Sequence, residues 1–574
     1  MPSSIHVSRR RFLRQTGLGL FALAGVPAWA QAMTMPAGPK LSPNKASPAF
    51  QPDVEIELAA RQSSVAILPG RPTRVLQYAA RLMKGPEGTL TSLPGSYLGP
   101  VMRLHKGQKV RIHFRNELSE PTIAHWHGMH VPALMDGHPM YAMDPGETFV
   151  YEFEVLNRAS LNIYHPHPHE LTGPQVYHGL AGGILVNDEE EAALSLPAGE
   201  YEIPVVLQDR RFDADNQLVY VRHMHERMMG FHGDRILVNG RPDFAVEVAS
   251  RAYRLRIMNG SNARIYKLGW DDGTPLTVIG TDGGLLEAPE VKSYVMLAPG
   301  ERLDVWADFS GRTVGSQLVM RSLPFSGALP RMARRMMGEM MHSSLPPGSD
   351  YPLFTVRVTR RVSESPSLPR RLAKISRYTL ADTVNPDKPV PLEISEGPMS
   401  MLINRRPYAH DDLQPFERIP LGSVQLLEIF HGHGGSGHGA GGEGMEHGGG
   451  PGMGMRGGMG MGMMGHRGGM GMMGGHGGGM EGGMGMMMSM AHPIHLHGQS
   501  FQIVSRTVSN ATMDDYASVR EGFIDSGWKD TVLAMPGERI RLIKPFQDFK
   551  GLFMYHCHNL EHEDMGMMRE FSIE

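Results

Sequence analysis

Apolar and polar residues alternate along many short segments of this chain. Examples are the segments 110–116 (Val-Arg-Ile-His-Phe-Arg-Asn), 253–259 (Tyr-Arg-Leu-Arg-Ile-Met-Asn) and 424–429 (Val-Gln-Leu-Leu-Glu-Ile). Because successive side chains of a β-strand point to opposite faces, this alternation predicts half-buried strands. Pro-Gly turns close these units, and long helical periodicity is scarce. The pattern therefore predicts an all-β fold built from β-sandwiches.

The same order of features occurs three times, which predicts three tandem domains. Each alternating segment leads to a second motif, which is His-Trp-His-Gly, Val-Ile-Gly or His-Leu-His-Gly, and then to Pro-Gly-Glu. A chain of 574 residues is also too long for a single core. The middle copy carries no histidine pair, so we expect it to hold no metal ligand and to act as a spacer. With linkers at 188–191 and 363–371, the expected domains are 48–190, 199–360 and 374–574.

A segment of different composition interrupts the third domain. Residues 431–490 contain 29 Gly, 16 Met and 6 His. With so few β-branched or aromatic residues, burial cannot offset the entropy of ordering this segment, so we expect a disordered insertion. A neutral linker explains the glycine but not the methionine. Thioethers are soft ligands that select Cu(I), so we favour a role in copper capture, with additional labile Cu(I) on the insertion.

The N-terminus has the features of a signal peptide, expected to span residues 1–32. A basic stretch with paired arginines precedes an apolar run and a small-x-small cleavage site, Ala-Trp-Ala. The arginine pair followed by Phe-Leu favours the twin-arginine export machinery over a plain Sec signal, and therefore a periplasmic protein. No other stretch reaches the roughly 18 apolar residues of a membrane helix. We therefore expect no membrane anchor. A formal net charge of −3 argues against a nucleic-acid partner. We also expect a monomer.

The only cysteine, Cys557, stands among other residue types that bind metals. No disulfide can form within the chain, so the thiol is either inert or present for its chemistry. His562 and Met567 follow within ten residues, and His492 can supply a second imidazole. A thiolate, two imidazoles and a thioether are the ligands of a blue-copper electron-transfer site. The alternative, a buried core cysteine, leaves these neighbours unexplained.

Histidine pairs of the form His-x-His supply a second set of ligands. In an extended segment, the two histidines that flank Cys557 must face away from its thiolate. Eight imidazoles in four such pairs suit a multinuclear copper cluster, since imidazole binds copper as well as zinc, iron and nickel. The pairs are His125 and His127, His165 and His167, His495 and His497, and His556 and His558.

These motifs resemble the four copper motifs of the multicopper oxidases. The resemblance runs from about residue 50 to the C-terminus, except for the insertion, and all twelve ligand positions are filled. It implies three cupredoxin-like domains and four copper ions, with a trinuclear cluster between the first and third domains. The implied ligands are Cys557, His492, His562 and Met567 for type 1 copper; His125 and His495 for type 2 copper; and His127, His165, His167, His497, His556 and His558 for the type 3 pair.

Reduction of O2 to two waters at such a cluster also consumes four protons, which copper-bound imidazoles cannot supply. Glu563, next to His562, and Asp136, eleven residues after His125, match positions where the family keeps acidic groups. We therefore predict Glu563 and Asp136 as catalytic proton carriers. The alternative for both is ordinary surface charge.

The reducing substrate has three possible assignments. The first is Cu(I), oxidised as in periplasmic copper-tolerance oxidases, which carry a Met-rich insert near type 1 copper. Here the insert lies in a different loop, immediately before His492, and 487–491 contains no aspartate, although Met490 can still serve. The second is a small phenol, as in laccases. The third is a copper-sequestering binding protein in which the oxidase centre is incidental.

Two smaller methionine clusters, 223–229 and 332–342, mix soft ligands with charged residues. Core packing and copper binding are equally expected for them, since the interleaved charges disfavour full burial. Several other histidines have no recognisable partner set and are expected to be structural or surface groups: His130, His138, His169, His178 and His232.

Overall fold

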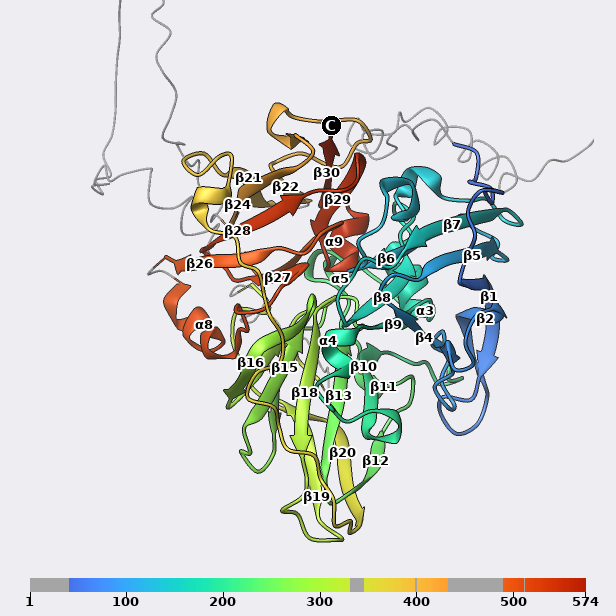
Figure 1. The fold of residues 1–574 in the computed structure, drawn as a ribbon, viewed down its shortest axis with the longest axis vertical. Helices are drawn as coiled ribbons and strands as arrows, with labels where there is room; N and C mark the ends of the chain where they lie inside the picture. Colours follow the sequence, from blue (N-terminus) through green and yellow to red (C-terminus); the bar gives the residue numbers. More distant parts are fainter. Residues whose placement is uncertain (1–40, 331–344, 398–399, 432–488, 510–511) are drawn as a thin grey trace, which may run out of the picture. The chain divides into compact units, whose positions relative to one another are not determined.

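Within the residues that the structure describes, the strands pair into six sheets, which form three pairs along the chain (Figure 1). The computed structural model describes residues 41–330, 345–397, 400–431, 489–509 and 512–574. All of the strands belong to one compact unit, residues 43–574. The predicted signal peptide at 1–32 lies outside the described residues.

The first pair of sheets is formed by residues 54–187, with strand orders β2-β1-β5-β7 and β3-β4-β9-β8-β6. The predicted alternation is observed in β5, where Val110, Ile112 and Phe114 are buried and the residues between them are less so. The strands are β1 (Val54–Val65), β2 (Thr73–Lys84), β3 (Leu90–Thr91), β4 (Val101–His105), β5 (Lys109–Asn116), β6 (Ala124–His127), β7 (Thr148–Glu154), β8 (Ser160–Pro166) and β9 (Gly182–Asn187).

The second pair is formed by residues 202–360, with orders β11-β10-β13-β18-β15-β16 and β12-β20-β19-β14-β17. The prediction of a half-buried strand is wrong for β13, because every one of its residues is buried. Its Arg254 is buried against Asp304, with Nε 2.8 Å from a carboxylate oxygen. The strands are β10 (Glu202–Arg210), β11 (Arg235–Val238), β12 (Ala245–Ala249), β13 (Ala252–Asn259), β14 (Tyr266–Trp270), β15 (Leu276–Thr281), β16 (Gly284–Lys292), β17 (Val295–Leu297), β18 (Arg302–Asp308), β19 (Gln317–Ser322) and β20 (Tyr351–Arg360).

The third pair is formed by residues 390–573, with orders β22-β21-β24-β28-β26 and β23-β30-β29-β25-β27. The insertion lies between β24 and β25, and its residues 432–488 are outside the described part. His431, Ser489 and Met490, which the composition grouped with it, are buried residues of the folded domain. The strands are β21 (Val390–Gly397), β22 (Ser400–Ile403), β23 (Arg418–Ile419), β24 (Ser423–His431), β25 (His492–Leu496), β26 (Gln502–Val508), β27 (Thr531–Ala534), β28 (Glu538–Phe546), β29 (Gly551–Cys557) and β30 (Met568–Ile573).

Helices are short and lie in the connections. The linker after β9 forms α4, which begins where the Asp188 side chain accepts a hydrogen bond from Glu191 N at 2.8 Å. The linker 363–371 contains neither helix nor strand. The α-helices are α3 (Thr172–His178), α4 (Glu189–Ala192), α5 (Met224–Met229), α8 (Met513–Ala517) and α9 (Leu560–Asp564); the 3-10 helices are η1 (Ala133–Met135), η2 (Pro139–Tyr141), η3 (Gly199–Tyr201), η4 (Leu380–Asp382), η5 (Pro415–Glu417) and η7 (Arg520–Gly522).

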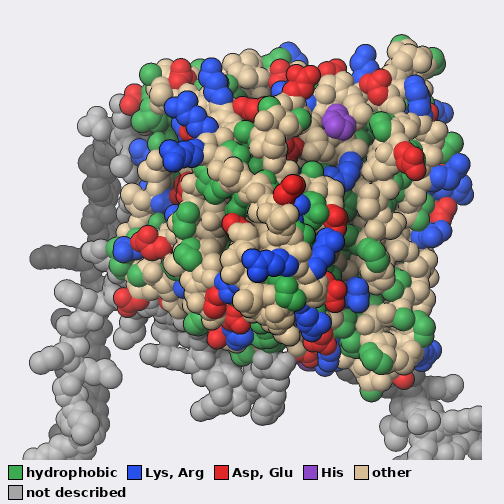
Figure 2. All heavy atoms as spheres, turned by 60° about the horizontal axis from the view of Figure 1, so that its bottom comes forward, with side chains coloured by type: hydrophobic (Ala, Val, Ile, Leu, Met, Phe, Trp, Pro, Cys, Tyr) green, Lys and Arg blue, Asp and Glu red, His purple; other side chains and the backbone are tan. Residues whose placement is uncertain are grey.

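Each pair of sheets encloses its own apolar core, so the all-β prediction of three sandwiches is confirmed. We keep 48–190, 199–360 and 374–574 as the proposed domain limits. On the face seen in Figure 2, described side chains of both charge signs are interspersed, as expected from the small net charge. None of the helices within the described residues is long and apolar enough to span a bilayer.

Candidate metal centre

The first group of candidate ligands surrounds Cys557. β25 pairs with β29 so that Ile494 lies opposite Cys557, and α9 follows β29 directly. Cys557 Sγ is consequently 3.4 Å from His492 Nδ1 and 3.8 Å from His562 Nδ1. The two nitrogens are 3.3 Å apart, and all three side chains are fully buried. One cation could contact all three atoms.

Backbone hydrogen bonds hold Met567 beside this group. Cys557 N donates to Met567 O at 3.0 Å, and Met567 N donates to His562 O at 2.9 Å. Burial raises the pKa of the Cys557 thiol. A bound cation must therefore displace the thiol proton, as is usual when a cysteine becomes a metal ligand.

The second group consists of eight buried histidines on facing edges of the first and third domains. The histidine-bearing strands β6 and β8 pair with each other in one domain, as β25 and β29 do in the other. Stacked rings join the two domains: the centroids of His125 and His497 are 3.9 Å apart. Those of His127 and His495 are 3.6 Å apart. The members are His125, His127, His165, His167, His495, His497, His556 and His558.

Unpartnered ring nitrogens show that this group fits a metal. Six of the eight histidines have a buried nitrogen without a hydrogen-bond partner, and an unmade hydrogen bond in the interior costs about 1–3 kcal/mol. Burial also lowers the pKa of most of these imidazoles, which favours the neutral form with a free lone pair. The six nitrogen sets are His125 Nε2, His127 Nδ1, His165 Nε2, His167 Nδ1, His495 Nε2, and both nitrogens of His558.

The two predicted proton carriers lie against these histidines. Asp136 Oδ2 is 2.6 Å from His497 Nδ1, and Glu563 Oε2 is 3.0 Å from His556 Nδ1. Both carboxyl groups are buried, so the alternative of surface charge is wrong. Burial raises the pKa of Asp136. Burial also raises that of Glu563, but the imidazoles of His556 and His167 outweigh it and hold the pKa below its usual range.

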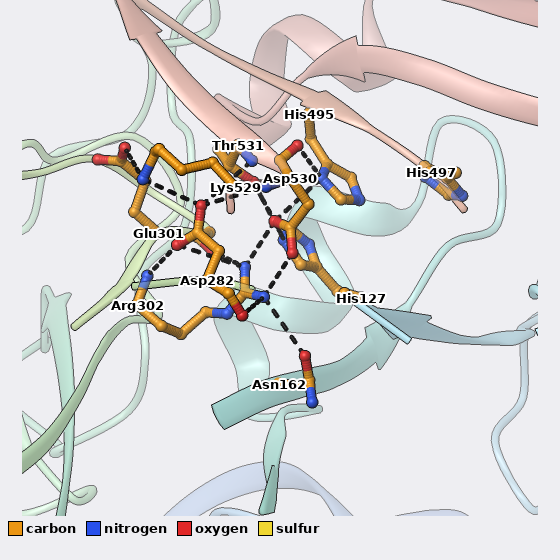
Figure 3. Close-up of polar contacts among 12 residues, drawn as sticks. His127, Asn162, Asp282, Glu301, Arg302, His495, His497, Lys529, Asp530 and Thr531 are labelled. Atoms are coloured by element: carbon orange, nitrogen blue, oxygen red, sulfur yellow. Dashed lines mark hydrogen bonds and ion pairs between the residues drawn. The ribbon is translucent and has the colours of Figure 1, made fainter. Parts of the chain in front are cut away.

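A third carboxylate, Asp530, was not predicted. Its Oδ1 is 3.0 Å from His127 Nε2, and its backbone oxygen is 2.9 Å from His495 Nδ1. Arg302, on β18 of the middle domain, donates to both carboxylate oxygens at 2.6 and 2.5 Å (Figure 3). The middle domain therefore contacts a carboxylate of the histidine group, which its interpretation as a spacer did not include.

A fourth carboxylate, Glu396, lies beside the Cys557 group. Its Oε1 is 2.9 Å from His492 Nε2 and accepts a hydrogen bond from Met490 N, also at 2.9 Å. His431 Nε2 donates to Met490 O at 2.7 Å. Burial raises the pKa of Glu396, but His431 and His492 outweigh it and bring the pKa to about 2.

Comparisons with known proteins agree with this geometry. Multicopper oxidase models match residues 75–191 and 482–574. A laccase of Bacillus stratosphericus is 28% identical over 85% of this chain and 91% of its own. The cell division protein FtsP of Edwardsiella tarda is 33% identical over 63% of this chain and 72% of its own. The crystal structure of McoA multicopper oxidase from Aquifex aeolicus is 28% identical, covers 93% of this chain and 100% of its own, and has a TM-score of 0.68.

This chain belongs to the multicopper oxidase family. A multicopper oxidase is an oxidoreductase that uses copper, O2 and a reducing substrate. The buried imidazoles with free nitrogens and the lone buried thiol fit that cofactor, since both ligand types bind copper.

The residues of the centre that were not predicted from the sequence do not belong to a recognisable sequence motif. Asp530 is 403 positions from His127, and Glu396 is 96 positions from His492. Neither lies in a motif with a metal-ligand spacing. The three-fold repeat did place Arg302 directly after Pro-Gly-Glu, but nothing in that repeat indicated which domain its side chain would contact.

Core packing is observed for part of the methionine cluster 223–229. Met228 and Met229 are buried in the core of the third domain, and Met228 O lies 3.0 Å from His562 Nε2. Met224, by contrast, is exposed. The cluster 332–342 lies outside the described residues. Among the other histidines, the expectation of a structural role fits His138, which is buried with its Nε2 3.1 Å from Glu570 Oε1.

Proposed function

We propose that this multicopper oxidase oxidises Cu(I) in the periplasm, after export by the twin-arginine route, and thereby serves copper tolerance. Four one-electron oxidations would reduce one O2 to two waters. The proposed ligands are Cys557, His492, His562 and Met567 for type 1 copper; His125 and His495 for type 2; and His127, His165, His167, His497, His556 and His558 for type 3.

The position of the methionine-rich insertion supports Cu(I) as the substrate. β24 ends at His431 and β25 begins at His492, and the rings of these two histidines are 5.5 Å apart. Met490 lies between them in the hydrogen-bond network of Glu396. The described residues on either side of the insertion thus lie beside His492, the proposed type 1 ligand. Soft thioethers in this segment would collect Cu(I) where electrons enter.

The chain supplies routes for electrons and protons. Copper held by these residues would supply the one-electron redox chemistry. Cys557 is covalently linked to His556 and His558, so one short backbone run joins the type 1 ligand to the cluster. Burial favours the protonated form of Asp136. The imidazoles next to Glu563, by contrast, favour the ionised form of that carboxyl group. Asp136 is therefore suited to hold a proton, and Glu563 to receive and pass one on.

Oxidation of small phenols is the second candidate, supported by the similarity to a laccase. In that case the methionines would serve as an apolar cover for the substrate. A copper-sequestering protein is the third candidate, in which the insertion retains copper and turnover is incidental.

Steady-state O2 consumption with Cu(I), a small phenol and Fe(II) tests the proposal. We expect the highest kcat/KM with Cu(I) and four Cu(I) oxidised per O2. Deleting residues 432–488 should lower Cu(I) oxidation and leave or increase phenol oxidation. A higher kcat/KM for the phenol in the full-length protein would establish the laccase function instead. Unchanged turnover with lost copper retention after the deletion would establish sequestration.

A further inference from the structure

The turn before β18 brings the middle domain into contact with the histidine group. Gly300 has a φ of 81°, which favours glycine. A Cβ atom at this position would lie 2.9 Å from His558 Cδ2 and 3.0 Å from His127 Cε1. The turn therefore packs its bare backbone on two of the proposed ligands.

Arg302, two residues later, is buried and holds parts of all three domains together. Its guanidinium donates to both oxygens of Asp530 in the third domain and, through Nε, to Leu161 O at 2.9 Å in the first. It also donates to Gly300 O and Asp282 O in its own domain, at 2.9 and 3.2 Å. With all of its donors engaged, this side chain has a single orientation.

Space for this guanidinium comes from Gly128, the glycine of His-Trp-His-Gly. A Cβ atom on Gly128 would lie 2.4 Å from an Arg302 nitrogen and 2.8 Å from Asp530 Oδ2. Gly128 also has a φ of 87°. The absence of a side chain on Gly128 therefore leaves space for the ion pair between Arg302 and Asp530, which joins the other two domains.

Asp530 in turn determines which nitrogen His127 presents. A neutral imidazole has one donor and one acceptor nitrogen. Because Asp530 Oδ1 accepts at 3.0 Å from His127 Nε2, the proton belongs on Nε2 and the lone pair on Nδ1. His127 Nδ1 is buried and unpartnered. The ring is therefore held with its free lone pair toward the other histidines.

We propose that Arg302 of the middle domain is a positioning residue for the copper cluster, acting through Asp530 on the orientation and tautomer of His127. This inference rests on the proposed role of His127 as a ligand. Carboxylates that hold a ligand histidine in place typically affect metal affinity or activity about 10- to 100-fold. The middle domain then completes the metal centre without contributing a ligand.

The test compares Arg302→Gln with a matched control, Arg254→Gln. Arg254 lies on β13, next to β18, is equally buried, and pairs with Asp304 within the middle domain. Both substitutions remove a buried bidentate ion pair, but only Arg302 is connected to a histidine of the cluster. Copper affinity of the cluster is measured by chelator competition, type 1 copper by its visible absorption, and stability by the Tm of the copper-free protein.

For Arg302→Gln we expect cluster affinity to fall about 10- to 100-fold while type 1 absorption is retained. Arg302→Lys keeps the charge but loses the two parallel hydrogen bonds of the guanidinium. Its cluster affinity for copper should therefore lie between those of Arg302→Gln and the wild type. Arg254→Gln should lower Tm and leave the competition curve unchanged. If Arg302→Gln does not fold, Arg302→Lys and Asp530→Asn carry the same comparison.

A wild-type competition curve for the Arg302 variants, or an equal loss of affinity in Arg254→Gln, would overturn the proposal. The route through Asp530 is tested by the double variant Arg302→Gln/Asp530→Asn. It should bind cluster copper no more weakly than Asp530→Asn alone, and an additive loss contradicts that route. Failure of the proposed ligand role is distinguishable, since the wild-type protein would then hold no copper at the histidine group, whereas a phenol preference in steady-state turnover would leave this test unaffected.

Discussion

The role of each histidine in the centre depends on which of its ring nitrogens the protein occupies. In His125, Nδ1 is 2.6 Å from Asp136 O and Nε2 is unpartnered. In His127, Nε2 is 3.0 Å from Asp530 and Nδ1 is unpartnered. Since a neutral imidazole has one donor and one acceptor nitrogen, the partner selects the nitrogen that remains for a metal. Two histidines of one motif therefore present different nitrogens.

Replacing Cys557 by serine should abolish the blue colour of the copper-loaded protein. The thiolate-to-copper absorption requires a thiolate, and the chain contains no other cysteine. The histidine group should still bind copper, because its ligands are separate side chains. Visible absorption combined with copper analysis checks both expectations. An intensely blue Cys557→Ser protein would falsify the type 1 assignment.

Replacing Glu563 by glutamine should slow reoxidation of the reduced protein by O2 about 100-fold or more. Reduction of type 1 copper by substrate should stay unchanged, because Glu563 contacts His556 and not the Cys557 group. Glu561→Gln is the matched control. Glu561 lies two positions away on α9 and is equally buried, but accepts from Tyr220 OH at 2.6 Å. Equal slowing of both half-reactions in single-turnover kinetics would rule out a proton-carrying role for Glu563.

At the residue scale, the sequence predicts the candidate ligands better than the groups that hold them. The ligands fall into short motifs because strands and turns bring near neighbours together, as with Cys557 and His562. The groups that orient them come from distant strands. Arg302 and Asp530, 228 positions apart, meet only through domain packing. No local pattern records such a contact, so periodicity and spacing cannot predict it.

The element that does most for the centre is the five-residue helix α9. Successive residues of an α-helix are rotated by about 100°, so three consecutive side chains point in different directions. Glu561 faces the loop around Phe231, whose N donates to it at 2.7 Å. His562 faces Cys557, and Glu563 faces His556. One turn of helix thus joins the Cys557 group, the histidine group and the middle domain.

The contacts of Glu570 on β30 predict that the folded state loses stability at low pH. Glu570 on β30 is buried and accepts from Tyr408 OH at 2.8 Å, and lies near His138 and His410. Burial raises its pKa, but His138, His410 and Tyr408 outweigh burial and bring it to about 2, from an ordinary value of 4.5. A pKa lower in the folded state contributes stability above pH 4.5, and this contribution is lost as pH falls toward 2.

The free energy of unfolding of the copper-free protein should therefore be lower in Glu570→Gln than in wild type by up to about 3 kcal/mol at neutral pH. The difference should shrink as pH falls below 4.5. Glu393→Gln is the control, since its ion pair with Arg405 is solvent-exposed and contributes little. A Glu570→Gln difference that is constant between pH 7 and pH 3 contradicts this role for the carboxylate.

At the scale of the whole molecule, the repeat and the alternation predict the three sandwiches but not how the domains cooperate. Alternation is a property of one strand, and it holds for β5. It does not hold for β13, where both faces are buried because ion pairs allow Arg254 into the interior. The absence of a histidine pair in the middle domain likewise does not predict the contacts of Arg302, because these contacts form only when the domains are assembled.

The insertion is the feature of the whole molecule whose removal should change substrate preference. Replacing its fifteen methionines within 432–488 by serine should raise the apparent KM for Cu(I) about fivefold, the equivalent of about 1 kcal/mol in capture. Met490 is left unchanged, because it is buried in the folded domain. The effect should be partial, since the histidines of the segment remain as ligands. Steady-state O2 consumption at varied Cu(I) measures it.

The matched control replaces fifteen glycines of the same segment by serine, which alters chain composition to the same extent but keeps every thioether. Its Cu(I) kinetics should match those of the wild type, and phenol oxidation should be similar in all three proteins. The difference for the methionine variant should be greatest at limiting copper, where capture limits the rate, and should disappear at saturation. If the methionine and glycine variants have the same Cu(I) kinetics at limiting copper, the segment is a linker and the thioethers have no part in substrate capture.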